Sequence, residues 1–175
     1  MLYRLDDKVP QIHRTAYIAA DCSIIGDVTV GNQSGIWFRT VLRADGQPIC
    51  IGSYTNIQDG SVIHITTRGS GVVIGNRVSV GHMAIVHAAV LEDNSFVGMA
   101  ATVMDNVVVR PYGLIAAGAL VTAGMEVPEK TLVAGVPAKV IRSLRQSEID
   151  MIEKTADLYV QKAEQFNEHC KPING

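Results

Sequence analysis

The chain has 175 residues, enough for one domain with its own core. Fifteen Lys and Arg residues against 17 Asp and Glu residues give a formal net charge of −2 at pH 7, which gives no electrostatic support for a nucleic-acid or anionic-membrane partner. Apolar residues make up 47% of the chain but aromatic residues only 5%, so the core should consist of Ile, Val, Leu and Ala.

The sequence gives no signal for export or for membrane insertion. No apolar run reaches the roughly 18 to 20 residues that span a bilayer, and residues 1–7 lack the apolar stretch of a secretory signal. The three cysteines, Cys22, Cys50 and Cys170, are an odd number at unrelated spacings, which argues against a disulfide framework. We therefore expect a cytoplasmic protein with no membrane partner.

An aliphatic residue recurs every six positions through most of the chain. The register runs through residues 18–42, 51–63, 74–86 and 91–133. A helix needs apolar residues every three or four positions and an ordinary strand every two, so this period predicts short strands joined by tight turns. Such hexapeptides resemble the left-handed parallel β-helix, an all-β solenoid with about 18 residues in each coil of a triangular prism. The chain would form about seven coils.

Three irregularities interrupt this register. Residues 42–51 carry three extra positions, residues 63–74 carry five extra, and residues 86–91 lack one. Insertions in a prism must bulge outward at its corners, where functional residues usually lie.

The period changes near the end of the chain. Residues 133–141 are predicted to form an exit turn, in which Pro137 prevents a helix from extending backwards. From Ser147 onward the apolar residues follow a spacing of three and four, which predicts an amphipathic helix over residues 147–169 with Ser147 as its N-cap. We expect this helix to pack along the prism. Residues 1–141 would then form the repeat domain (repeat proper 17–138), and residues 142–175 the helix and tail of the same domain.

Three of the five histidines, His64, His82 and His87, lie within the repeat. His64 and His87 each follow the inward aliphatic residue of their strand by one position, on successive coils. Their imidazoles should therefore stack about one strand spacing, roughly 4.8 Å, apart. His82 lies two positions after such a residue, on the preceding face, and should point around a corner away from the pair.

One chain should therefore be unable to bring all three imidazoles to one metal ion. If three prisms pack about a threefold axis, the His64 and His87 column of one chain can meet His82 of the next, and a cyclic trimer closes three equivalent sites. Three imidazoles with one open position are typical of a catalytic zinc site. His13 and His169 lie outside the register and are not expected to bind metal.

Charged residues occupy the same columns one coil earlier. Arg43 should share a column with His64, and Asp59 should share one with His82. Arg43 is a candidate for an ion pair across the subunit boundary, with Asp45 or Asp59 as its partner.

Two uncharged residues lie beside Asp59. Asn56 and Gln58 could orient a metal-bound water without neutralising it. Asn56 could instead be a turn residue at a corner of the prism.

In order and spacing these residues resemble the signature of the gamma-class carbonic anhydrases, and the resemblance covers nearly the whole chain. It is carried by Leu42-Arg43-Ala44-Asp45, by Thr55-Asn56-Ile57-Gln58-Asp59-Gly60, and by His64, Gly81-His82 and His87. It implies a homotrimer that binds Zn2+ (with Fe2+ or Co2+ as alternatives) through the three histidines. It also implies the reversible hydration of CO2 to bicarbonate by a metal-bound hydroxide at the trimer interface.

The resemblance further implies a role for each matching residue. Gln58 would orient the attacking water with support from Asn56, and Tyr159 would reach the site from the carboxy-terminal helix. Arg43 and Asp45 would form the intersubunit ion pair.

The chain departs from the family pattern in its acidic residues. Efficient members carry a glutamate after the position of Asp45 and a proton-shuttle glutamate in a loop that corresponds to residues 66–71. Here Gly46-Gln47-Pro48 follows Asp45, and residues 66–71 contain no carboxylate. Proton export, and with it hydration, is therefore expected to be slow.

Three other functions stay open. The same site could hydrolyse an acyl-CoA thioester, or the protein could be a non-enzymatic metal-binding scaffold. Residues 134–139 also resemble the exit sequence of hexapeptide acyltransferases, although those enzymes typically use one catalytic histidine and no metal. Metal analysis separates the carbonic anhydrase and thioesterase functions from acyl transfer, and a CO2 hydration assay separates the first from the rest.

Overall fold

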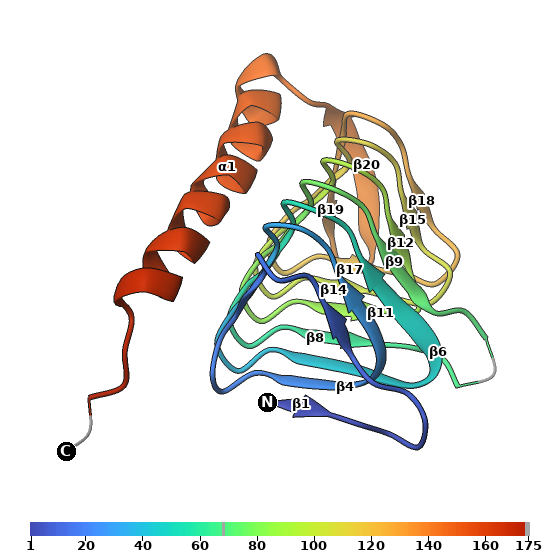
Figure 1. The fold of residues 1–175 in the computed structure, drawn as a ribbon. Coiled ribbons are helices and arrows are strands. Elements are labelled where there is room, and N and C mark those ends of the chain that lie inside the picture. Colours follow the sequence, from blue (N-terminus) through green and yellow to red (C-terminus); the bar gives the residue numbers. More distant parts are fainter. Residues whose placement is uncertain (68, 174–175) are drawn as a thin grey trace.

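The computed structural model describes residues 1–67 and 69–173, and shows short strands coiled into a triangular prism with one long helix beside it (Figure 1). Two faces of the prism belong to a twelve-stranded sheet in the order β17-β14-β11-β8-β6-β9-β12-β15-β18, with β4 paired to β6 and with β1 and β2 paired to β4. The third face is an eight-stranded sheet in the order β20-β19-β16-β13-β10-β7-β5-β3. The predicted left-handed parallel β-helix, with about seven turns, is confirmed.

Most of the strands are only two or three residues long. The twelve-stranded sheet contains β1 (Leu2–Tyr3), β2 (Gln11–Ile12), β4 (Ser23–Val30), β6 (Val41–Ile51), β8 (Val62–His64), β9 (Val72–Ile74), β11 (Ile85–His87), β12 (Val90–Leu91), β14 (Thr102–Val103), β15 (Val108–Val109), β17 (Leu120–Val121) and β18 (Glu126–Val127). The eight-stranded sheet contains β3 (Tyr17–Ile18), β5 (Gly35–Ile36), β7 (Asn56–Ile57), β10 (Ser79–Val80), β13 (Phe96–Val97), β16 (Leu114–Ile115), β19 (Thr131–Gly135) and β20 (Ala138–Ser143).

The six-residue period places one aliphatic side chain of each strand in the core. Leu42, Ile63, Val86, Val103 and Val121 pair in register on successive strands of one face, and each is fully buried. Because the core is filled by these inward residues, the outward residues of the same strands are free to carry chemistry.

The first insertion bulges from the ladder between the long strands β4 and β6. Gly26 pairs with Ala44 and Val28 pairs with Ile49, so residues 45–48 lie opposite a single residue, Asp27. Gly26 has a φ of 79°, and a Cβ at this position would lie 2.3 Å from the carbonyl oxygen of Ala44, so a larger residue would not fit.

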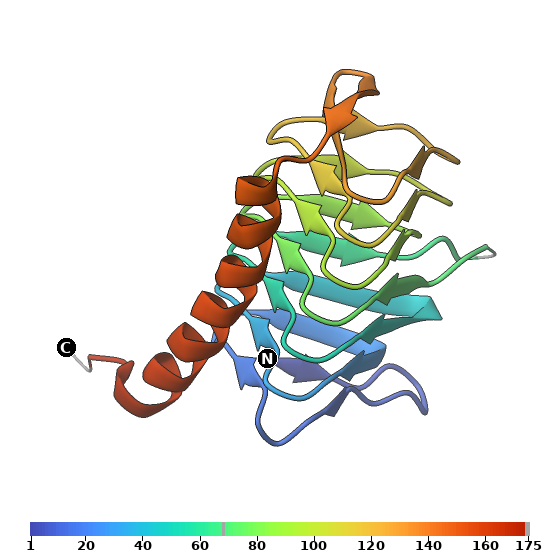
Figure 2. The same ribbon diagram turned by 90° about the horizontal axis from the view of Figure 1, so that it is seen from above.

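The second insertion links β8 to β9 and projects from the prism (Figure 2). Arg68, within the predicted loop 66–71, lies outside the described residues. Both insertions lie on the side of the prism where β8 and β11 end.

The chain leaves the prism through a hairpin, whose turn at Val136-Pro137 lies within the predicted exit turn of residues 133–141, although strands occupy the rest of that range. β19 continues the parallel ladder from β16, and β20 then returns antiparallel to it. Gly135 has a φ of 102° and precedes Val136-Pro137, where the direction of the chain reverses. β20 thereby pairs with the edge that the last coil would otherwise leave open.

The predicted helix is confirmed as α1 (Gln146–His169), but its N-cap is Arg145 and not Ser147. Glu148 explains this difference, because its carboxylate accepts a hydrogen bond from the backbone N–H of Arg145 at 2.8 Å and also binds both terminal nitrogens of Arg142. These contacts start the helix one residue before Ser147.

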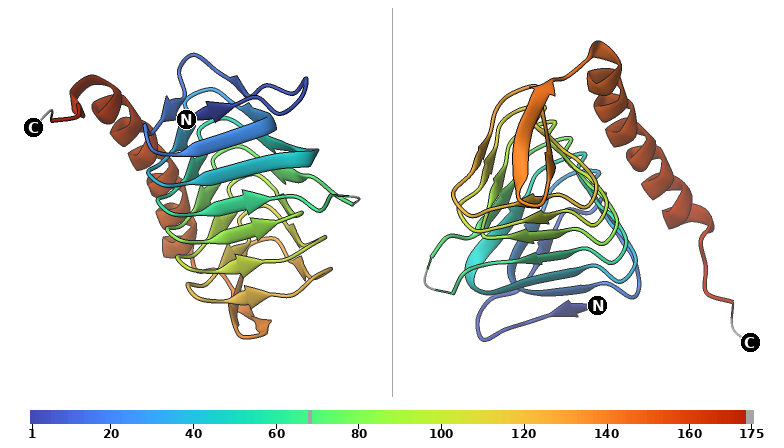
Figure 3. Two further views of the ribbon diagram at one scale, coloured as in Figure 1. Left: turned by 90° about the horizontal axis from the view of Figure 1, so that it is seen from below. Right: turned by 180° about the vertical axis from the view of Figure 1, so that it is seen from behind.

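The helix packs along the eight-stranded face and runs back from the last coils toward the first (Figures 2 and 3). Its buried residues are Ile152, Ala156 and Ala163. Trp37 of the prism lies with its ring centroid 5.2 Å from that of Tyr159 and 5.1 Å from that of Phe166. Within the described residues, no helix is long and apolar enough to cross a membrane.

Candidate metal centre

His64 and His87 lie side by side at the ends of β8 and β11. The two strands pair in register, with His64 opposite His87. The ring centroids are 5.1 Å apart, and Nδ1 of His64 lies 3.1 Å from Nε2 of His87. The predicted stacking of this pair is confirmed, and the distance follows from the spacing of neighbouring strands.

His82 lies apart from this pair, as predicted. It follows β10 on the eight-stranded face and precedes the corner that leads into β11. Its Nδ1 lies 2.9 Å from Oδ2 of Asp59, one coil earlier. Within the part of the chain that the structure describes, no three His, Cys, Asp or Glu side chains of one protomer converge so as to hold a metal ion.

Each of the three histidines has a carboxylate on one ring nitrogen. Asp45 lies 3.0 Å from Nε2 of His64, and Asp105 lies 3.0 Å from Nδ1 of His87. A carboxylate accepts hydrogen bonds but has none to donate, so each contact favours the tautomer of a neutral ring in which the nitrogen that faces the carboxylate carries the proton. In these tautomers the opposite nitrogens, Nδ1 of His64 and Nε2 of His87, have lone pairs that face one another.

This donor set fits a divalent metal ion. Two lone pairs 3.1 Å apart repel one another unless a cation lies between them. Two imidazole nitrogens that bind one tetrahedral Zn2+ at about 2.0 to 2.1 Å lie roughly 3.3 Å apart, close to the observed separation. Imidazoles oriented by carboxylates are the usual arrangement of metal-binding histidines.

The two carboxylates beside the pair remain ionised at neutral pH. Burial, the largest single influence on Asp45, raises its pKa, but the hydrogen bond from His64 and the charge of Arg43 outweigh it and the net pKa is lowered. The hydrogen bond from Thr66 is the largest influence on Asp105, and the pKa of that carboxyl is lowered as well. Both groups are therefore hydrogen-bond acceptors for the imidazoles.

Arg43 contacts Asp45 of its own chain. Arg43 pairs in register with His64, as predicted, and its guanidinium forms an ion pair with the carboxylate of Asp45. Asp59, the other candidate partner, contacts His82 instead. An ion pair of Arg43 across a subunit boundary therefore stays a prediction.

Asn56 and Gln58 are both buried and hydrogen-bonded to each other. Nε2 of Gln58 donates to Oδ1 of Asn56 at 2.9 Å, and Nδ2 of Asn56 donates to Oγ of Ser79 at 2.9 Å. Asn56 belongs to β7, so the alternative that it is a corner residue is wrong. The chain of amide contacts directs Oε1 of Gln58 away from Asn56, as the atom available to accept a further hydrogen bond.

Tyr159 reaches from the helix to His82. Its hydroxyl lies 3.5 Å from Nε2 of His82, and burial raises the pKa of the phenol. Gln58, His82 and Tyr159 form the polar part of a hollow of about 400 Å³. The rest of its lining is mainly apolar: Gly81, Phe96, Gly98, Met99, Leu114, Ile115, Ala116, Ala117, Met151 and Thr155.

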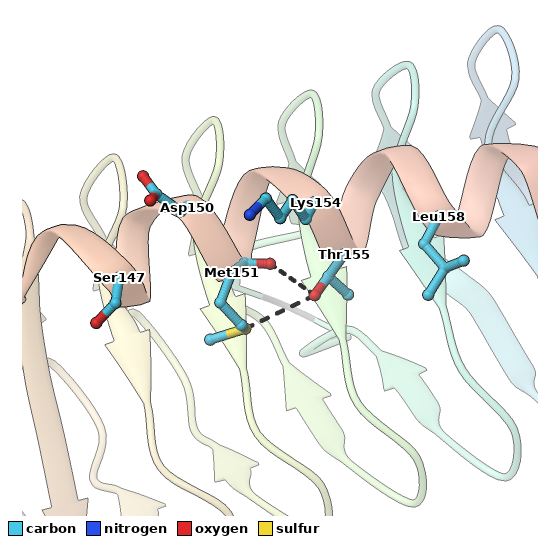
Figure 4. A pocket seen from close by; sticks show the side chains of 6 residues that line it. All are labelled: Ser147, Asp150, Met151, Lys154, Thr155 and Leu158. Carbon is cyan, nitrogen blue, oxygen red and sulfur yellow. Dashed lines mark hydrogen bonds between the residues drawn. The ribbon is translucent and has the colours of Figure 1, made fainter.

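A second hollow, of about 320 Å³, lies along the helix itself. All the residues that line it belong to α1: Ser147, Asp150, Met151, Lys154, Thr155 and Leu158 (Figure 4). The hydroxyl of Thr155 donates to the backbone carbonyl of Met151 at 2.7 Å, one turn earlier. No histidine lines this hollow, and we assign no chemistry to it.

Asp105 is a site residue that the sequence analysis missed. It lies two positions after the inward Val103, whereas His87 lies one position after Val86, so the columns alone do not align the two. The side chain bridges this offset diagonally and also accepts a hydrogen bond from Thr66 in the second insertion. An acidic residue on the coil that follows a repeat histidine was the signal that could have revealed it.

Comparison with known proteins identifies relatives over the whole length of the fold. The chain is 40% identical to "Probable carbonic anhydrase" of Methanocaldococcus jannaschii over 153 residues, which covers 87% of this chain and 96% of that protein. It is 40% identical to "Gamma carbonic anhydrase 1, mitochondrial" of Arabidopsis thaliana over 179 residues, or 99% of this chain. The chain spans 65% of the length of the Arabidopsis relative. No protein-family model matches the chain.

A solved structure supports the same fold. The hexapeptide transferase family protein from Anaplasma phagocytophilum superposes with a TM-score of 0.91 and 40% sequence identity, covering 94% of this chain and 97% of that one.

Proposed function

The chain belongs to the gamma-class carbonic anhydrase family, and from this premise we propose that it is a metal-dependent carbonic anhydrase, a lyase that interconverts CO2 and bicarbonate at sites shared between the subunits of a homotrimer. The observation that carries the proposal is the facing pair of ring nitrogens of His64 and His87, held 3.1 Å apart by carboxylates on their far sides. The third histidine, His82, lies one face away and is available to a neighbouring chain.

His64 and His87 of one chain would hold the metal together with His82 of the next. The three neutral imidazoles suit Zn2+, and they also suit Fe2+ or Co2+. When bound, such an ion lowers the pKa of a coordinated water from about 15.7 toward 7 and so supplies hydroxide at neutral pH.

The outer surface beside the pair supports a trimer. Val62 and Ile85 stand opposite each other on β8 and β11, and their side chains are 36% and 42% exposed. Met83, at the corner that precedes β11, is 71% exposed. Apolar side chains gathered on the strands that carry His64 and His87 are typical of a surface that a partner covers. A cyclic trimer would bury this surface at three equivalent interfaces.

The residues around His82 fit a small apolar substrate. Gln58 has Oε1 available to accept a hydrogen bond from the water that reacts, and Asn56 fixes the orientation of the amide. Tyr159 adds a hydroxyl beside Nε2 of His82. Phe96 and Leu114 form an apolar wall, which favours an uncharged gas such as CO2 over a polar ligand.

Stopped-flow CO2 hydration on anaerobically purified protein of measured metal content is the decisive experiment. We expect activity proportional to the bound metal and its loss in His87→Ala. A fully metallated trimer with no hydration activity would exclude the proposal. The control is His13→Ala, because His13 contacts Thr15 on the surface of the first coils and should leave activity unchanged.

Thioester hydrolysis is the second candidate, and the size of the hollow beside His82 favours it. At about 400 Å³ and with a mainly apolar lining, the hollow has more room than CO2 requires and could take an acyl chain. Hydrolysis of acyl-CoA substrates by the metallated protein, with no CO2 hydration, would establish this function instead. Acyl transfer fits less well. That reaction requires a single catalytic base, whereas three histidines here each contact a carboxylate.

We also propose that the enzyme acts in the cytoplasm. The three cysteines are all free in the structure, and Cys50 and Cys170 are exposed, which suits a reducing compartment. Fractionation of the native cells with an antibody against the chain tests this location.

A further inference from the structure

We infer that Asp105 is a positioning residue for the metal centre, which holds His87 in the tautomer that carries its proton on Nδ1 and directs the lone pair of Nε2 toward His64. This role of Asp105 rests on the proposed function, in which His87 is a metal ligand. Asp105 itself does not face the space between the two imidazoles, and it acts through His87.

Asp105 contacts His87 directly, from the coil that follows the coil of His87. Oδ2 of Asp105 lies 3.0 Å from Nδ1 of His87. Asp105 follows β14, which pairs with β11 in register, so the carboxylate belongs to the coil immediately after that of His87. Asp45 contacts His64 in the same way from the coil before. The pair of imidazoles is thus enclosed between two carboxylates, one on each side.

This arrangement opposes a competing hydrogen bond. Nδ1 of His64 and Nε2 of His87 are close enough for one ring to donate its proton to the other at 3.1 Å. Such an imidazole-to-imidazole hydrogen bond would use up one lone pair and leave the pair unable to bind a metal through both nitrogens. Asp105 favours the proton on the far nitrogen of His87, so that this hydrogen bond does not form.

Thr66 fixes the carboxylate in turn. Its hydroxyl donates to Oδ1 of Asp105, which leaves Oδ2 for His87. Thr66 lies three positions after Ile63, in the segment that links β8 to β9, and so brings a hydroxyl group to the far side of the carboxylate.

The first test compares the Zn2+ affinities of the wild type and two variants. In Asp105→Asn, Oδ1 still accepts from Thr66, so the amide N–H2 faces Nδ1 of His87 and favours the wrong tautomer. Asp105→Ala removes the contact altogether. Loss of such an orienting partner typically weakens metal binding about 10- to 100-fold, and we expect both variants to fall in this range when they compete with a chromophoric chelator.

A matched control separates this effect from loss of charge or of fold. Glu126→Gln makes the same carboxylate-to-amide change in the same sheet, where Glu126 contacts Arg110 and no histidine. Its Zn2+ affinity should equal that of the wild type. The thermal midpoints of the metal-free proteins should agree between the wild type and both Asp105 variants, since the inward residues form the core.

The second readout is the tautomer itself, observed in metal-free protein by long-range proton–nitrogen NMR correlations of the histidine rings at a pH where they are neutral. We expect His87 to carry its proton on Nδ1 in the wild type and on Nε2 in Asp105→Asn. The same tautomer in both proteins, or an unchanged Zn2+ affinity, would overturn the inference. Neither readout uses catalysis, so a protein that binds Zn2+ through His87 but hydrates no CO2 would refute the proposed function and leave the role of Asp105 intact.

Discussion

His82 is held by Asp59, with 2.9 Å between Nδ1 and Oδ2, on a face of the prism that meets the strands of the other two histidines only at a corner. After His82 the chain turns the corner into β11 (Ile85–His87), which ends at His87, so the length of this strand separates the two side chains within one chain. A metal centre built from all three imidazoles would therefore require a second subunit.

Complementation between variants tests this shared site. His82→Ala and His87→Ala should each bind no metal tightly, because every interface of such a trimer lacks one ligand. When equal amounts of the two chains are refolded together, about a quarter of the interfaces should combine an intact His82 with an intact His87 partner, and the same share of metal binding should return. Elemental analysis after gel filtration measures it.

A site completed within one chain would give a different result. Recovery of no metal in the mixed trimers, together with one tightly bound ion per chain in a monomeric wild type, would mean that one chain completes the site alone. Circular dichroism should show that both single variants keep the prism, since neither histidine contributes to its core.

Arg43→Ala should weaken the trimer. Arg43 pairs with Asp45, and if a neighbouring subunit covers that carboxylate, the loss of its partner typically costs about 3 to 5 kcal/mol. Sedimentation at micromolar concentration should show dissociation. Arg39→Ala is the control, because Arg39 is 87% exposed and lies 3.8 Å from Asp21, and this variant should remain a trimer. An unchanged trimer in Arg43→Ala would mean that the ion pair acts only within its own chain.

Tyr159→Phe should separate chemistry from packing. The variant keeps the ring against Trp37 and loses only the hydroxyl beside His82, so we expect unchanged stability and metal content and a kcat lowered roughly tenfold. Tyr159→Ala removes the ring as well and should lower the free energy of unfolding by about 2 to 4 kcal/mol in urea titration. Equal kcat values for wild type and Tyr159→Phe would show that the hydroxyl has no part in the reaction.

Proton removal should limit the rate of hydration. The carboxylates nearest to the histidine pair, Asp45 and Asp105, are both engaged as hydrogen-bond acceptors of the rings. We expect kcat to rise with the concentration of imidazole buffer while kcat/KM for CO2 stays constant, because the proton leaves after bicarbonate has formed. Gly46→Glu should reduce this dependence on buffer. Stopped-flow rates independent of buffer would show that another group exports the proton.

The carboxyl group of Glu148, at the start of α1, should make the stability of the protein depend on pH. The hydrogen bonds from Arg142 lower the pKa of Glu148 from 4.5 to about 2. A carboxyl whose pKa is lower in the folded state stabilises the protein above pH 4.5, and this contribution disappears as the pH falls toward 2. The thermal midpoint of Glu148→Gln should therefore lie below that of the wild type at pH 6 and approach it at pH 2. Glu168→Gln, at the other end of the helix, should show no such convergence.

Much of the architecture could be predicted from the sequence because a β-helix is repetitive. A single inward residue in every six positions determines the strand, its face and its neighbours. The register of His64 with His87, and that of Arg43 with His64, follows directly from the positions of Ile63 and Val86. Pairs of residues far apart in the chain can therefore be assigned as neighbours by counting six-residue repeats, which is unusual for β proteins.

The features that the sequence did not predict arise where the register ends or where a side chain bridges between columns. The hairpin of β19 and β20 depends on pairing beyond the last coil, and the helix start depends on contacts that Glu148 makes with Arg142 and Arg145. Asp105 was not predicted because its side chain reaches to His87 from a neighbouring column of the prism. Periodicity contains no information about such contacts.

The path of α1 has a consequence for how the molecule unfolds. In most solenoids each repeat touches only its neighbours, so the terminal coils can fray independently. Here α1 begins after the last coil, and near its other end Phe166 packs against Tyr17 of the first coil, with ring centroids 6.0 Å apart. Opening either end of the prism therefore disturbs a segment that is anchored at the other end. The backbone amides of the strands from β3 to β16 should therefore exchange with solvent at similarly slow rates. The prism should unfold in a single cooperative transition, without a gradient of protection from its ends.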